Sequence, residues 1–91
     1  MNEWVISLET GSGAGAGDET LETIHEALDG DPIAQAPVVG FHVPGPIITA
    51  RIEVEAASAE EAEDIARAAF ERALAAAGVT TTCDVVGVDP A

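Results

Sequence analysis

Ten residues near the middle of the chain, 47–56, alternate strictly between two kinds of side chain. One set is small or apolar: Ile48, Ala50, Ile52, Val54 and Ala56. The other set is mixed: Ile47, Thr49, Arg51, Glu53 and Glu55. A period of two is that of a β-strand with one buried face. The preceding Pro44-Gly45-Pro46 has the order of a type II turn, so we expect a hairpin with a strand over about Pro37–Val43.

A helix is predicted directly after this strand. Ser58 to Glu61 form a capping box, in which the serine hydroxyl accepts from the backbone three residues on and Glu61 reaches back. The helical pattern continues to Ala77 and stops at Gly78, a residue typical of a left-handed cap. The expected inward face is Ala62, Ile65, Ala66, Ala69, Phe70, Ala73 and Ala77.

The two ends of the chain supply three further elements. Residues 3–9 alternate as a strand, and residues 79–88 are rich in valine and threonine. Asp18 can cap a helix that runs to about Asp29 and ends before Gly30 and Pro32. The apolar stripe of that helix is Leu21, Ile24, His25 and Leu28.

Strand, helix, hairpin, helix and strand is the order of the ferredoxin-like β-α-β-β-α-β sandwich. We therefore predict one α+β domain over residues 1–91, with a four-stranded antiparallel sheet in the order 4-1-3-2. Right-handed crossovers place both helices on one face. The predicted core is Trp4, Ile6, Leu8, Ile48, Ile52, Val54, Ile65 and Phe70. Many unrelated families share this arrangement, so the fold leaves function open.

The charge is strongly one-sided. Seventeen acidic residues oppose three arginines, which gives a net charge of −14. Such a chain disfavours nucleic acid and membrane surfaces as partners. Nine carboxylates are expected on the outer side of the helices: Glu19, Glu22, Glu26, Asp29, Glu60, Glu61, Glu63, Asp64 and Glu71. They could attract a basic protein, for example as a decoy for a DNA-binding protein, or they could serve solubility alone.

Compartment and membrane signals point to a cytoplasmic protein. Cys83 is the single cysteine, so it has no disulfide partner within the chain. The residues from Met1 to Trp4 lack the basic and apolar regions of a signal peptide. The longest mostly apolar run, 37–50, is too short and too rich in proline to span a bilayer.

The glycine-rich segment 11–17 lies between a strand and a helix N-terminus, where backbone amides favour anions. Its spacing fits neither a P-loop nor a dinucleotide fingerprint, and it lacks the arginine that an acylphosphatase loop needs. Asp18 and Glu19 already occupy the positive end of the helix dipole. We expect a mobile loop here and predict no cofactor.

Few residues offer reactive chemistry. His25, His42 and Cys83 are isolated and lack the close spacing of a metal site, so no metal is predicted. A Cys-His catalytic pair lacks a recognisable orienting group. Glu53 and Glu55 beside Arg51 are typical of a solvated patch rather than an acid-base dyad. No nucleophile, base and orienter can be assembled, so enzymatic activity ranks last.

The sheet face away from the helices gives the favoured hypothesis. It is expected to carry Val5, Ser7, Glu9, Ile47, Thr49, Arg51, Glu53, Glu55, Thr80, Thr82, Asp84, Val86 and Val88. Without aromatic side chains it does not suit RNA. Its aliphatic residues and the long last strand favour a non-enzymatic homodimer that acts as an interaction or accessory module. A monomer, a small-molecule-binding regulatory domain and an acidic decoy remain alternatives.

Overall fold

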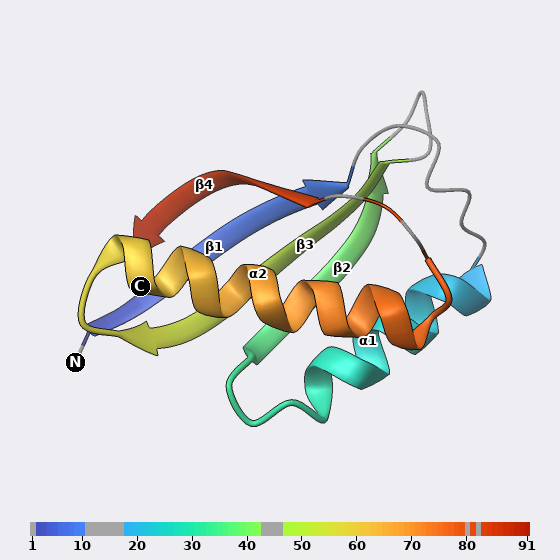
Figure 1. Cartoon of the computed structure of the whole chain (residues 1–91), viewed down its shortest axis with the longest axis horizontal. Helices are drawn as coiled ribbons and strands as arrows, with labels where there is room; N and C mark the ends of the chain where they lie inside the picture. Colours follow the sequence, from blue (N-terminus) through green and yellow to red (C-terminus); the bar gives the residue numbers. More distant parts are fainter. Residues whose placement is uncertain (1, 11–17, 43–46, 80, 82) are drawn as a thin grey trace.

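The computed structural model describes residues 2–10, 18–42, 47–79, 81 and 83–91. It contains the predicted order of elements (Figure 1). They are β1 (Asn2–Thr10), α1 (Asp18–Asp29), β2 (Gln35–His42), β3 (Ile47–Ala56), α2 (Ala59–Ala76) and β4 (Cys83–Pro90). Within the described ranges, neither helix has the length and apolar character needed to cross a membrane. The glycine-rich segment, the Pro-Gly-Pro turn and the side chains of Asp18, Phe41 and His42 lie outside the described part.

The sheet confirms the ferredoxin-like topology. Its strand order is β2-β3-β1-β4, and every neighbouring pair is antiparallel. Both helices lie on one face of the sheet, and no described element covers the other face, which is called the uncovered face (Figure 1). In the central pair, Ile6 lies opposite Ile52 and Leu8 opposite Ala50, so the inward sides of β1 and β3 coincide.

The core largely matches the prediction, with two corrections. Six of the eight predicted residues are buried: Ile6, Leu8, Ile48, Ile52, Val54 and Phe70. Trp4 and Ile65 are only partly buried and pack against the rim of the core. Trp4 lies towards the end of the sheet, opposite Val54, where its indole Nε1 donates to the Ala56 carbonyl at 3.2 Å. An indole with its polar edge at the rim satisfies that donor.

The helices contact the sheet through small residues and a few large ones. α2 buries Ala62, Ala66, Ala69, Phe70, Ala73 and Leu74. α1 contributes Ile24 and Leu28. Leu74 was missed from the sequence, whereas Ala77 is only half-buried. The first turn of α2 begins as predicted, because the Ser58 hydroxyl accepts from the Glu61 amide at 3.3 Å. The second hydrogen bond of a capping box, from the Ser58 amide to the Glu61 carboxylate, does not form between these two described residues.

β4 begins later than predicted, at Cys83 rather than Val79. The cause is the end of α2. Gly78 adopts φ +74°, its amide donates to Ala75 at 3.0 Å, and the Val79 amide donates to Leu74 at 2.9 Å. These two hydrogen bonds form a Schellman motif. Because the amides of Gly78 and Val79 donate to the helix, they are not free to pair in a sheet.

A β-bulge corrects the expected face of Val88. Ser7 lies opposite Gly87, but Leu8 lies opposite Val85, so Val86 is the extra residue. Beyond the bulge the alternation is inverted. Val88 therefore lies opposite Ile6 and packs against the core instead of facing outward.

A second bulge occurs in β2, where the strand begins earlier than predicted, at Gln35. Gln35 lies opposite Glu53 and Val38 opposite Arg51, and Ala36 adopts φ +45°. Pro37 is accommodated here because this edge strand has an irregular ladder.

Candidate functional site

The uncovered sheet face has a shallow hollow at its centre. In the central row, Arg51 of β3 lies between Val38 of β2 and Ser7 of β1, and Ser7 faces Gly87 of β4. The hollow has a volume of about 270 Å³. Its lining includes Ser7, Glu9, Val38, Thr49, Arg51 and Val86.

Two valines stand at opposite edges of this hollow. Val38 on β2 is 62% exposed and Val86 on β4 is 56% exposed. Among the described residues, Ile33 is the only other exposed large hydrophobic side chain, and it is 45% exposed. The sequence suggested Val86 but not Val38. Val38 lies on this face because it is opposite Arg51 in the ladder between β2 and β3. Val5 and Ile47, also predicted here, are half-buried.

The polar groups of this face surround one cation. Arg51 is exposed, and among the described residues of this face it is the only basic side chain. Glu9 and Glu53 are half-buried. The Thr49 hydroxyl donates to the Gly40 carbonyl at 3.2 Å and is thus held within the sheet. Glu53 and Glu55, the rejected acid-base dyad, accept no hydrogen bond from a described residue.

The three soft-ligand candidates do not converge in the described part. His25 is exposed on α1, which corrects its assignment to the apolar stripe. The buried face of α1 contains Ile24 and Leu28, and His25 lies outside this face. The side chain of His42 lies outside the described residues. Within the described ranges, no group of three His, Cys, Asp or Glu residues could hold a metal ion.

Cys83 is buried, and its thiol points from β4 towards α2. The Sγ atom donates to Oε1 of Glu71 at 3.8 Å, a long sulfur hydrogen bond. Burial raises the pKa of Cys83 above its usual value, and the charge of Glu71 raises it further. The thiol therefore stays protonated at neutral pH, which makes it a poor nucleophile.

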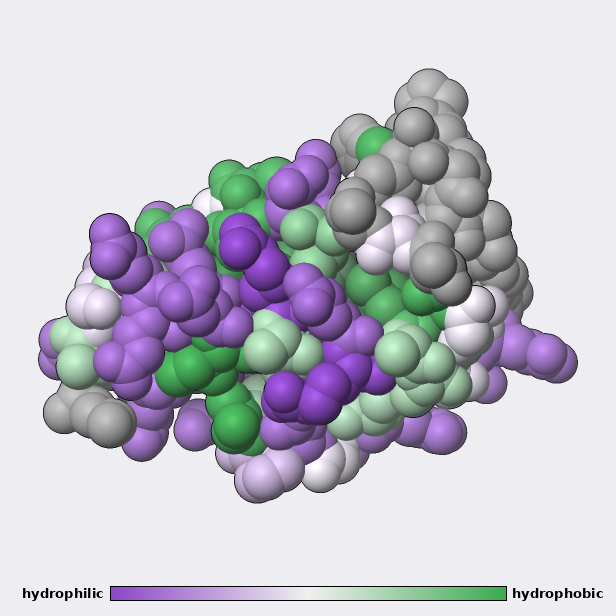
Figure 2. Space-filling view, viewed as in Figure 1, coloured by the Kyte–Doolittle hydropathy of each residue, from purple (hydrophilic) through white to green (hydrophobic). Residues whose placement is uncertain are grey.

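The helix layer carries the predicted acidic surface, with hydrophilic side chains over much of it (Figure 2). Eight of the nine expected carboxylates are exposed, and Glu63 is half-buried. Arg72 of α2 forms an ion pair with Asp31, in which Nη2 of the arginine lies 2.8 Å from Oδ2 of the aspartate. This contact lowers the pKa of Asp31. A basic partner for this surface stays a prediction, because solvation alone accounts for exposed carboxylates.

Comparisons with known protein families, with characterised proteins and with solved structures gave no match. The geometry therefore defines the class of protein, a ferredoxin-like α+β sandwich with an uncovered sheet face, and the functional argument rests on that face.

Proposed function

We propose that this chain is a non-enzymatic interaction module that works as a homodimer, with the uncovered sheet faces packed against each other. The observation that carries the proposal is the pair of exposed valines on the two edge strands, with the hollow between them. Sheets that pack face to face commonly bury such mixed aliphatic surfaces.

The order of the strands makes this face self-complementary. A two-fold axis parallel to the strands, midway between β3 and β1, places β2 of one copy over β4 of the other. Val38 of each copy then meets Val86 of the other. The same operation places Arg51 over β1 of the second copy, the strand that carries Glu9. An isologous interface repeats each contact, so four valines and two arginine–glutamate pairs would take part.

Pairing through the sheet edges is the weaker alternative. β4 carries the bulge at Val86 and ends with Pro90, and β2 carries Pro37 and its own bulge. Bulges and prolines on edge strands disfavour the addition of another strand.

The energetics predict a modest, salt-sensitive dimer. Each valine is already partly covered, so burial of the remainder contributes about 1 kcal/mol per side chain. Each copy carries a charge of −14, and the repulsion between copies opposes association. Screening relieves that repulsion, so added salt should favour the dimer.

Sedimentation equilibrium at high micromolar concentration tests the proposal. The wild type should show a mass approaching twice the 9.2 kDa of one chain, and Val86→Glu should remain monomeric. Val86 is exposed, so this change should leave the fold intact. Ile33→Glu is the matched control, since Ile33 is also exposed but lies beside Glu61 and Ile65 of α2. It should dimerise like the wild type. A monomeric wild type, or equal dimerisation of Val86→Glu, refutes the proposal.

A further inference from the structure

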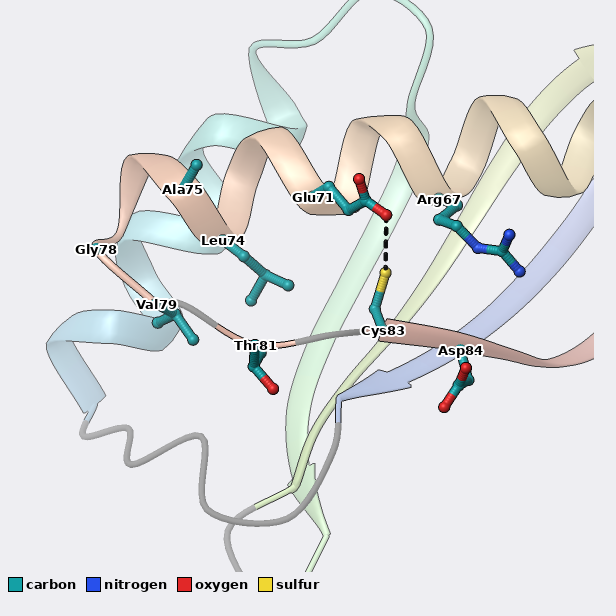
Figure 3. Close-up of a pocket in the computed structure, with 9 residues that line it drawn as sticks. All are labelled: Arg67, Glu71, Leu74, Ala75, Gly78, Val79, Thr81, Cys83 and Asp84. Carbon is teal, nitrogen blue, oxygen red and sulfur yellow. Dashed lines mark hydrogen bonds between the residues drawn. The ribbon is translucent and has the colours of Figure 1, made fainter.

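A second concavity lies on the helix side of the sheet, between α2 and the segment that leads into β4 (Figure 3). Its volume is about 730 Å³, within the range of sites that hold small ligands. The side chains that matter here are Arg67, Glu71, Leu74, Val79 and Cys83. The proposed dimer face is on the opposite side of the sheet, so the two sites are independent.

The end of α2 builds the apolar end of this cleft. The Schellman motif returns the chain past the last turn of the helix and brings Val79 back towards Leu74. Figure 3 shows the Leu74 side chain directed from α2 towards the side of the cleft that carries Val79 and Thr81. Leu74 is buried and Val79 is half-buried, so together they form an aliphatic wall.

Arg67 lies at the other end and forms no hydrogen bond or ion pair with another described side chain. Its Nε atom is buried without a hydrogen-bond acceptor. Within the described residues its guanidinium forms no ion pair, although the chain contains 17 acidic residues. In Figure 3 the side chain extends from α2 along β4, past Cys83. A buried donor without an acceptor destabilises the folded chain. The two Nη atoms of Arg67 are not among the buried atoms that lack a partner, and they are the donors that a ligand oxygen would reach.

Glu71 lies between these two ends, one helical turn from Arg67. One carboxylate oxygen accepts from Cys83, and the side chain is exposed. Asp84 also borders the cleft, but its carboxylate is directed away from it (Figure 3). The cleft therefore presents a cation, then an anion, then an aliphatic wall. A ligand with only a negative charge would meet Glu71, and one with only a positive charge would meet Arg67.

We propose that this cleft binds an aliphatic α-amino acid. The ligand carboxylate would accept from Arg67, its ammonium group would donate to Glu71, and its side chain would contact Leu74 and Val79. The three groups of such a ligand are attached to one carbon, and each has a counterpart among the side chains that line the cleft. Both polar contacts are charge-assisted hydrogen bonds, which are stronger than neutral ones.

Titration of the ¹⁵N-labelled protein with three related compounds tests the assignment by amide chemical shifts. L-leucine carries both charges, 4-methylpentanoate lacks the ammonium group, and 3-methylbutylamine lacks the carboxylate. L-leucine should bind at least about tenfold more tightly than either, since each lacks one charged hydrogen bond. The shifted amides should centre on Glu71, Leu74 and Val79. Absence of a saturable shift with L-leucine, or equal affinity for 4-methylpentanoate, overturns the proposal.

Two charge-matched variants make the test specific. Arg67→Gln should weaken L-leucine binding by about tenfold or more, because it removes the carboxylate partner. Arg72→Gln removes the same charge from the same helix outside the cleft, and it should leave the affinity within about twofold of wild type. Amide spectra and thermal melts confirm that both variants fold. Equal L-leucine binding by folded Arg67→Gln and wild type refutes the role of Arg67.

Discussion

Replacement of Phe70 by alanine should remove a large part of the stability of this domain. Phe70 is fully buried, and a buried phenylalanine covers about 150–250 Å². At about 25 cal/mol per Å² this corresponds to about 4–6 kcal/mol, of which the remaining methyl group retains about 0.8 kcal/mol. The expected loss is about 3–5 kcal/mol. Its buried neighbours along α2, Ala66 and Ala73, are too short to fill the vacated volume.

Urea unfolding, followed by the fluorescence of Trp4, measures this loss. Trp4 is the only tryptophan and is partly buried in the folded state, so its emission reports unfolding. Ile33→Ala is the control, because Ile33 is exposed and its truncation should change stability by less than about 0.5 kcal/mol. If Phe70→Ala unfolds at the same urea concentration as the wild type, the packing of α2 on the sheet is wrong.

Two electrostatic predictions follow from the same structure. Salt raised from about 20 to about 500 mM should increase the melting temperature, because screening relieves the repulsion of a chain with charge −14; a flat or falling melting temperature contradicts this. Arg72→Gln should raise the pKa of Asp31 towards its ordinary value of 3.8, measured by NMR titration of the carboxyl group. Because Arg72 depresses that pKa, the stabilising effect of Asp31 is present above its unfolded-state pKa and disappears as the pH falls through the folded-state value. An unchanged pKa would show that the ion pair does not persist in solution.

The sequence alone determined the order of elements and the whole of β3. Its ten alternating residues bury one set of side chains, and the structure has the strand over Ile47–Ala56, as predicted. α1 likewise spans the predicted residues, and α2 begins after Ser58. These signals are local: a side-chain period, a capping serine and a terminating glycine act within one or two turns.

The outward-facing surface depended on pairing between distant residues. A bulge adds one residue to a strand and inverts every side chain beyond it, and nothing in the local alternation of β4 marks where this occurs. Val88 therefore packs against the core. Val38 is exposed because it lies opposite Arg51 in the ladder between β2 and β3.

The cleft on the helix side was also decided by tertiary structure. The sequence placed Glu71 on the outer side of the second helix and Cys83 within the last strand. Only the packing of α2 beside β4 brings Cys83 to Glu71 and buries Arg67 Nε without an acceptor among the described residues. Local patterns fix which residues form each element because neighbours along the chain interact there. The uncovered face and the cleft depend on elements that are far apart in the chain. The register between their strands and the distance between helix and sheet are set only when the whole core packs.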